Sequence, residues 1–102
     1  MRVEWSLHAR TDLRELKAYI AKDSPFYARR FIERIITAVG KLSQPPHLGR
    51  LVPEAQRDDV RELLIQHYRV IYQTKDERLC IVTVVHGSRD LIKQDPPPWK
   101  TS

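Results

Sequence analysis

The chain has 102 residues, a length that fits one domain, and 41% of them are hydrophobic, enough for one modest core. Lysine and arginine number 18 against 13 aspartate and glutamate residues, and the resulting formal net charge of +5 favours anionic partners over a merely solvated basic surface. No apolar run approaches the roughly 18 residues of a membrane-spanning helix, so we expect no membrane span and no membrane partner.

The N-terminal part predicts a strand followed by a helix. Residues 3–7 alternate between apolar and polar side chains, which is typical of a half-buried β-strand. Leucine and isoleucine then recur at helical spacing through residues 13–20, with charged residues on the other side. Ser6 or Thr11 is expected to cap the start of this helix.

A second helix is predicted to begin at Ser24 and Pro25. Serine suits the N-cap, and proline suits the first helical position, where its missing N–H costs nothing. The helix is expected to run to about Leu42 on an apolar stripe of Ala28, Phe31, Ile32, Ile35, Val39 and Leu42. The short connection makes the two helices an antiparallel hairpin.

Beyond residue 44 the hydrophobic period changes from helical to strand-like. After a loop at residues 44–49, we predict a short extended piece at 50–52, a second loop at 53–59, and strands at 60–65, 68–73 and 79–85. The last of these is almost wholly apolar and contains the only cysteine, Cys80. A single thiol forms no internal disulfide, so we interpret Cys80 as a buried residue in a reducing compartment. The N-terminal residues do not resemble a secretory signal, and we expect the cytoplasm.

The order of elements predicts an α+β fold, in which an N-terminal strand and an antiparallel helical hairpin pack on an antiparallel sheet of three to four further strands. We expect a single domain over residues 1–92. Residues 93–102 are proline-rich and are predicted to form a flexible tail.

The alternation of side chains predicts which strand residues share a face of the sheet. With a turn at Gln66 and His67, Ile65 pairs with Tyr68 and Leu64 with Arg69. The more apolar face should meet the helices and carries Arg61, Leu63, Ile65, Tyr68, Val70 and Tyr72. The other face is expected to be open and carries Val60, Glu62, Leu64, Arg69, Ile71 and Gln73. In the last strand, the set expected on the open side is Thr83, Val85, Gly87 and Arg89.

Two arginines on this open face have two interpretations. Arg69 and Arg89 would form an anion site, because guanidinium groups match phosphate and carboxylate oxygens. Alternatively, Arg69 forms an ion pair with Glu62, and Arg89 with a nearby aspartate. His86 is predicted to point the other way, and it is either a hydrogen-bonded structural residue or an acid–base group.

The chain shows no other motif for catalysis. The four histidines lack metal-ligand spacing, and there is no nucleophile elbow, P-loop or dinucleotide fingerprint. We therefore expect no metal and no cofactor. Any catalysis would be metal-free and would use basic side chains around a phosphate.

Four segments of the C-terminal half carry a resemblance to a known family: GRLVPE (49–54), VREL (60–63), YRVIY (68–72) and VVHGSRDL (84–91). In this order and spacing they resemble the RelE/ParE superfamily of toxins from type II toxin–antitoxin systems. A helical hairpin with Asp12 and Leu13 early in its first helix also fits. The resemblance extends from about Val3 to Leu91 and implies a curled sheet.

The resemblance implies a toxin that a cognate antitoxin neutralises in a hetero-oligomer. RelE-like members cleave mRNA on the ribosome without a metal, whereas ParE-like members poison DNA gyrase. Arg69 and Arg89 match arginines of the RNA-cleaving branch. In that case they and Arg61 would bind the phosphate, with His86 as the acid–base candidate.

Several departures favour the ParE-like branch. Glu62 stands where the RNA-cleaving branch often has lysine and would repel a phosphate. Residues 93–95 and three prolines stand where that branch often places a tyrosine. We therefore expect a gyrase-directed toxin. The alternatives are a ribosome-dependent endoribonuclease and an inactive module that mainly binds its antitoxin through an acidic, amphipathic segment of that partner.

Overall fold

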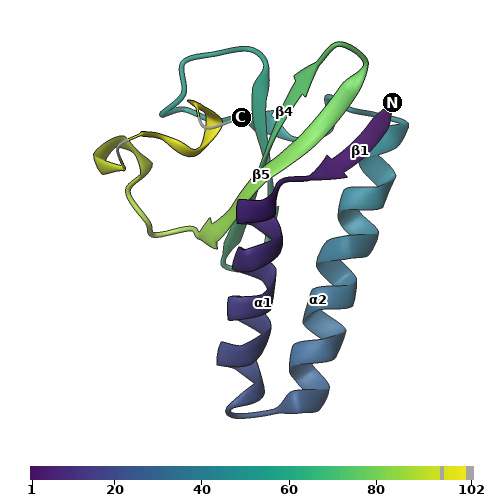
Figure 1. Cartoon of the computed structure of the whole chain (residues 1–102), viewed down its shortest axis with the longest axis vertical. Helices are drawn as coiled ribbons and strands as arrows, with labels where there is room; N and C mark the ends of the chain where they lie inside the picture. Colours follow the sequence, from purple (N-terminus) through teal and green to yellow (C-terminus); the bar gives the residue numbers. More distant parts are fainter. Residues whose placement is uncertain (95, 101–102) are drawn as a thin grey trace.

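The computed structural model describes residues 1–94 and 96–100. Its first half consists of β1 (Arg2–Trp5), α1 (Leu7–Ala21), α2 (Pro25–Gly40) and the 3-10 helix η1 (Lys41–Ser43). Its second half consists of β2 (Arg50–Leu51), β3 (Val60–Ile65), β4 (Tyr68–Lys75), β5 (Arg78–His86) and the 3-10 helices η2 (Leu91–Lys93) and η3 (Pro98–Lys100). Helices α1 and α2 lie side by side, and their connection is at the end of the molecule away from the sheet (Figure 1).

The strands form one five-stranded sheet in the order β1-β5-β4-β3-β2. Strand β1 pairs with β5 in parallel, whereas the three other pairings are antiparallel. A parallel pair needs a long crossover, which the helical hairpin and the following strands provide. The predicted α+β fold is confirmed, and the parallel strand makes the sheet mixed.

Local capping explains where both helices begin. Ser6, rather than Thr11, caps α1, because its Oγ accepts a hydrogen bond from the Ala9 N–H at 3.0 Å. Ser24 caps α2 in the same way through the Tyr27 N–H, and Pro25 occupies the first turn as predicted. The helix changes to a 3-10 turn after Gly40.

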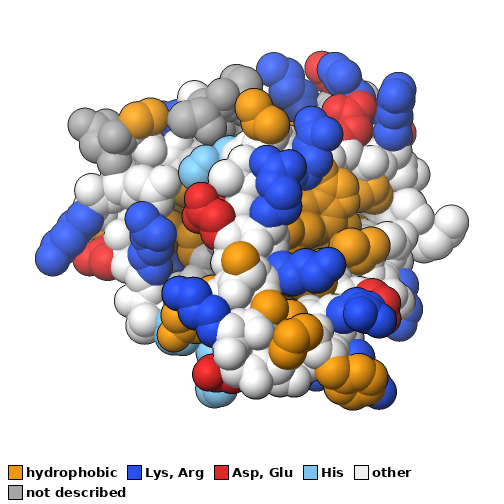
Figure 2. Space-filling model, turned by 60° about the horizontal axis from the view of Figure 1, so that its bottom comes forward, with side chains coloured by type: hydrophobic (Ala, Val, Ile, Leu, Met, Phe, Trp, Pro, Cys, Tyr) orange, Lys and Arg blue, Asp and Glu red, His pale blue; other side chains and the backbone are white. Residues whose placement is uncertain are grey.

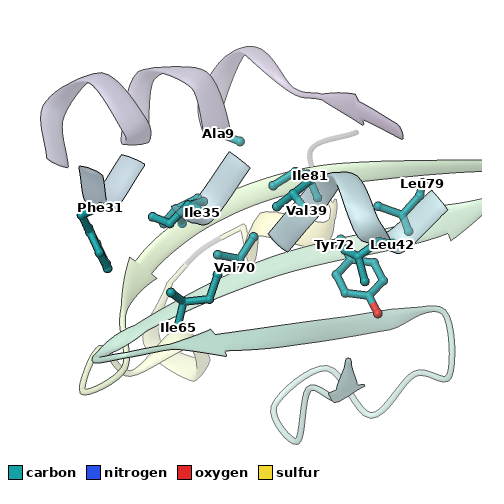
Figure 3. Packing of buried hydrophobic residues seen from close by; sticks show 11 residues of the cluster. Ala9, Phe31, Ile35, Val39, Leu42, Ile65, Val70, Tyr72, Leu79 and Ile81 are labelled. Carbon is teal, nitrogen blue, oxygen red and sulfur yellow. The ribbon is translucent and has the colours of Figure 1, made fainter. Parts of the chain in front are cut away.

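The main hydrophobic core lies between the helices and the sheet. Figure 3 shows Phe31, Ile35 and Val39 of α2 pointing toward the sheet, where Val70 is among the residues that meet them. The predicted assignment of strand residues to the helix-facing side is confirmed by Ile65, Val70 and Tyr72, which all belong to this core. Its residues lie on five elements and η1, so the hairpin and the sheet depend on each other for burial.

The opposite face of the sheet is only partly open, although it was predicted to be open throughout. A second hydrophobic cluster covers part of it, formed by Val52, Val60, Ile71, Val82, Val85, Leu91 and Trp99. Leu64 on the same face is 54% exposed. Three of these residues lie outside β3, β4 and β5, in the loop after β2, in η2 and in η3. The sequence pattern missed this cover because it depends on contacts of irregular segments with residues far away in the chain.

A β-bulge interrupts the alternation of side chains in β5 just before Thr83. Ile71 pairs with Thr83 but the next residue, Tyr72, pairs with Ile81, so Val82 has no partner residue in β4. This irregularity breaks the simple alternation of side chains. Thr83 lies opposite Ile71 and Val85 lies opposite Arg69, so both stay on the face that was predicted for them. The Thr83 hydroxyl donates to Asp12 Oδ2 of α1 at 2.6 Å.

The segment predicted to be a flexible tail, residues 93–102, contains η3. Within it Trp99 is only 5% exposed and packs with the second cluster. Residues 95 and 101–102 lie outside the described residues. Trp99 connects η3 to the sheet, while the boundary at residue 92 and the flexibility of the tail stay predictions.

Candidate functional site

The candidate site lies on the face of β3 and β4 that points away from the helices. Arg69 is opposite Leu64, so it shares this face with Glu62, two residues earlier on β3. Both side chains are withdrawn from water, with Glu62 1% and Arg69 5% exposed. Buried charges of this kind need partners, and the two residues provide one for each other.

Arg69 donates three hydrogen bonds to two carboxylates. Its Nε lies 2.6 Å from Glu62 Oε1, and its Nη1 and Nη2 each lie 2.8 Å from one oxygen of Glu54. The paired contact with Glu54 has the geometry in which guanidinium groups also bind phosphate. Glu54 therefore occupies the place that an anionic ligand would take on a free arginine.

A second arginine completes this network. Arg50 Nε lies 2.6 Å from Glu62 Oε2, so that Glu62 bridges the two arginines. The two arginines and the two glutamates balance in charge. The two hydrogen bonds from Arg69 lower the pKa of Glu54, and the same two hydrogen bonds are the main cause that raises the pKa of Arg69. The lowered pKa keeps Glu54 ionised beside Arg69 at physiological pH.

Gly49 positions Arg50 at the edge of the sheet. A Cβ at Gly49 would lie 2.6 Å from the Glu62 carbonyl oxygen and 2.7 Å from the Tyr72 hydroxyl, so no larger residue fits without movement. The Gly49 N–H donates to that hydroxyl at 3.0 Å, and the hydroxyl donates to the Pro46 carbonyl at 2.8 Å. These contacts hold the loop before β2 against the sheet.

Sequence reasoning anticipated the ion pair between Arg69 and Glu62 but missed the parts played by Glu54 and Arg50. One signal was available. A mid-strand arginine among apolar residues needs enough carboxylates to neutralise it, and Glu54 lies in the loop just before β3.

Arg61 does not join Arg69. Its cross-strand partner is Tyr72, which lies in the main core on the helix side of the sheet. Arg61 Nη1 donates to the Gly49 carbonyl at 2.9 Å, and its buried Nε has no hydrogen-bond partner within the described part of the chain. The predicted phosphate-binding arginines thus lie on different faces.

His86 and Arg89 lie at and beyond the end of β5, and both are exposed. His86 Nδ1 accepts a hydrogen bond from the Ser88 N–H at 3.1 Å and lies 2.7 Å from the Ser88 hydroxyl. An acceptor at Nδ1 leaves Nε2 to carry the proton of the neutral ring. The His86 ring also contacts His67 and Tyr68, at centroid distances of 6.3 and 5.3 Å.

A groove of about 580 Å³ runs beside the network. It is lined by Arg50, Pro53, Glu54, Leu64, Gln66, His67, Tyr68, Arg69, Gly87 and Ser88. Arg69 therefore lies at the wall of the groove, with its donors turned to the two glutamates. Arg89 is not among the described residues that line it.

The described part of the chain offers no alternative site for metal or thiol chemistry. Among residues 1–94 and 96–100, no three His, Cys, Asp or Glu side chains lie close enough to hold a metal ion. Burial raises the pKa of Cys80, so at physiological pH this residue is the neutral thiol, which is less nucleophilic than the thiolate. In the same part of the chain, no helix is long and apolar enough to cross a membrane.

Comparison with known proteins identifies the relatives of this chain. The family model described as the ParE toxin of the type II toxin–antitoxin system parDE matches residues 3–91. Toxin RelE2 of Caulobacter vibrioides is 32% identical over 87 residues, which cover 85% of this chain and 96% of that protein.

Two solved structures share the fold. A chain of the chromosomal ParDE system from P. aeruginosa matches with a TM-score of 0.71 and 21% identity, over 84% of this chain and 95% of that one. A chain of the toxin–antitoxin complex RelBE2 from Mycobacterium tuberculosis matches with a TM-score of 0.57 and 24% identity, over 83% and 95%.

Proposed function

We propose, from the premise that this chain belongs to the ParE toxin family of type II toxin–antitoxin systems, that it arrests growth by poisoning DNA gyrase and that a cognate antitoxin neutralises it. Family membership carries the toxin role. The gyrase target is our inference. It is supported by the hydrogen bonds of Arg69 to Glu54 and Glu62, which leave this arginine poorly placed to bind a phosphate for RNA cleavage.

The occupation of Arg69 is the observation that carries this proposal. Metal-free RNA cleavage depends on cations that bind the scissile phosphate and stabilise the charge of its transition state. Here Glu54 and Glu62 accept three hydrogen bonds from Arg69. A phosphate that approached this face would have to displace the Glu54 carboxylate and would meet the negative charge of both glutamates.

The position of His86 supports the same conclusion. A general acid or base must lie within hydrogen-bond reach of the atom that it serves. His86 Nδ1 is already bonded to Ser88, and the side chain lies outside the set that lines the groove beside Arg69. The sheet face therefore works better as a rigid recognition surface than as an active site.

One observation favours the second candidate, a ribosome-dependent endoribonuclease. His67, Tyr68 and Ser88 line one end of the groove, and they bring an imidazole, a phenol and a hydroxyl near Arg50. Such groups serve in acid–base chemistry. This candidate requires the loop that carries Glu54 to leave Arg69 when the toxin binds its target.

The proposal is tested by incubating the purified toxin with DNA gyrase and supercoiled plasmid. We expect inhibition and a trapped cleavage complex that yields linear DNA after protein denaturation. Catalytically unchanged gyrase at a large molar excess of toxin, together with growth arrest in cells, would reject the gyrase target. Harmless overexpression would instead indicate a module that only binds its antitoxin.

A further inference from the structure

The end of the chain covers part of the sheet face that carries Arg69. Leu91 of η2 and Trp99 of η3 are both buried in the second hydrophobic cluster. Figure 1 shows this part of the chain in yellow, returning from the end of β5 toward the loop between β2 and β3. The match to the family model ends at residue 91, so η3 lies outside the matched region. Residues 91–94 and 96–100 are the C-terminal segment of the following paragraphs.

The C-terminal segment packs against the turn that carries Glu54. This turn comprises residues 52–55 and is closed by a hydrogen bond from the Ala55 N–H to the Val52 carbonyl at 3.1 Å. Both ends of the turn pack in the second cluster, to which Trp99 belongs. Glu54 stands between them and accepts two hydrogen bonds from Arg69. The C-terminal segment therefore helps to hold Glu54 on Arg69.

The closed arrangement carries costs that opening would remove. The N–H groups of Gln94 and Lys100 donate inside the C-terminal segment, to the Leu91 carbonyl at 3.2 Å and the Pro97 carbonyl at 3.0 Å. Gln94 Oε1 is buried without a hydrogen-bond partner in the described part of the chain, and water would satisfy it. Gln56, directly after the turn, has a positive φ of 51°, a conformation that is strained for a residue with a side chain. Apolar contacts of Leu91 attach the segment against these costs, together with those of the η3 tryptophan.

Movement of the turn would change the charge of the arginine network. Arg69 would keep Glu62 as a partner through Nε, while its two Nη groups would lose Glu54. Two guanidinium groups, of Arg50 and Arg69, would then face one carboxylate. Both arginines line the groove of about 580 Å³. A guanidinium with two free parallel donors binds phosphate oxygens in pairs, so opening would uncover a place for a phosphate group.

We propose that the C-terminal segment is autoinhibitory: it keeps Glu54 on Arg69 and thereby closes a binding site for a phosphate group. When the segment leaves the second cluster, the turn at residues 52–55 loses the contacts of Trp99, and Glu54 no longer competes with the anion. Coupling of this kind is reciprocal, so bound phosphate favours release of the segment by the same factor by which release favours phosphate. The inference goes beyond the proposed function and does not depend on the gyrase target.

The first test measures this reciprocity in the full-length protein. Trp5→Phe leaves Trp99 as the only tryptophan, so that tryptophan fluorescence reports on the C-terminal segment alone. Inorganic pyrophosphate, added at constant ionic strength, should make Trp99 more accessible to quenching by acrylamide. Unchanged quenching at concentrations of pyrophosphate that saturate binding would overturn the proposal.

The second test compares pyrophosphate affinities by calorimetry. Trp99→Ala should lower the dissociation constant by about tenfold, within the 5- to 150-fold range that is typical of coupled sites. Ile92→Ala is the matched control in the same segment, because Ile92 is 75% exposed, and it should bind like the wild type. Val39→Ala weakens the main core and not the second cluster, so it controls for a general loss of stability. Circular dichroism verifies that each variant is folded.

A double variant shows whether the segment acts through Glu54. Glu54→Gln removes the competing charge and should itself strengthen binding of pyrophosphate. In that background Trp99→Ala should add little, because both changes remove the same competitor. Other cations also attract anions, and Figure 2 shows lysine and arginine side chains across the helical end of the molecule. All variants keep these cations, so a difference from the wild type does not come from them.

Each outcome decides a part of the proposal. Equal dissociation constants for the wild type and Trp99→Ala would overturn the autoinhibitory role, and so would an equal gain from Ile92→Ala or Val39→Ala. A Glu54→Gln variant that binds no better than the wild type would overturn the phosphate site. Fully additive gains from Trp99→Ala and Glu54→Gln would reject the route through Glu54. Gyrase inhibition is measured separately, so a failure here is distinguishable from a failure of the proposed function.

Discussion

Replacing Arg69 with methionine tests whether this arginine serves the fold. Methionine keeps much of the length and apolar stem of arginine but removes every donor. The change leaves Glu62, which is 1% exposed, with Arg50 as its remaining cation. It also leaves Glu54 without the two hydrogen bonds that Arg69 donates to it. Removing one partner of a buried ion pair costs about 3–5 kcal/mol.

We expect a loss of about 3 kcal/mol in the free energy of unfolding, at the low end of that range, because Arg50 still neutralises Glu62. The loss is a large fraction of the roughly 5–15 kcal/mol that stabilises a typical domain, and it should lower the melting temperature by about 12–24 °C. Urea titration followed by circular dichroism measures it directly.

Two controls make the test specific to the network. Adding Glu62→Gln to Arg69→Met removes the buried negative charge, so the double variant should be more stable than the single one.

The second control is the dependence of stability on pH. The pKa of Glu54 is lowered in the folded state, so the contribution of Glu54 to stability is present above its ordinary pKa of about 4.3 and is lost as the pH falls. Arg69→Met should reduce this acid dependence. A single variant within about 1 kcal/mol of the wild type would refute the structural role of Arg69.

Three further substitutions test how the chain supports this face. Asp12→Ala removes the acceptor of the Thr83 hydroxyl and the Val84 N–H, and it should lower the free energy of unfolding by about 2–3 kcal/mol in urea titrations. Thr83→Val removes only one of these hydrogen bonds and should cost less. Equal costs would contradict the role of the Asp12 carboxylate. Gly49→Ala should lower the free energy of unfolding by at least about 2 kcal/mol, because its Cβ would clash with the Glu62 carbonyl and the Tyr72 hydroxyl. Gly40→Ala is the control: its Cβ meets no atom within 4 Å, so it should stabilise the protein by about 0.5–1 kcal/mol. Similar melting temperatures for the two variants would reject the close approach at residue 49. Glu77→Gly should stabilise by about 0.5–1 kcal/mol, because residue 77 has a positive φ of 64° in the β4–β5 turn, and a lower melting temperature would argue against that turn.

Local patterns predicted the fold well because its elements follow local rules. Ser24 and Pro25 indicated the start of α2, and the turn at Gln66 and His67 set the register between β3 and β4. Once that register was known, alternation assigned Val70 to the helix side of the sheet and Arg69 to the other side.

What sequence reasoning missed depends on contacts between distant parts of the chain. The unpaired Val82 breaks the alternation in β5, and no feature of an apolar run indicates where such an irregularity falls. Glu54 reaches Arg69 from an irregular loop, and Trp99 covers the sheet from η3. Each of these contacts joins segments whose relative position is set by the tertiary fold.

Because Glu54 and Glu62 occupy Arg69, we expect the toxin to act without cutting RNA. The most direct measurement is to map the 5′ ends of cellular messages after induction of the toxin, at a time when growth has stopped. We expect complete growth arrest with messages whose 5′ ends match those of uninduced cells. New 5′ ends at fixed positions within codons, present with the wild type and absent with Arg69→Lys at equal protein abundance, would contradict it.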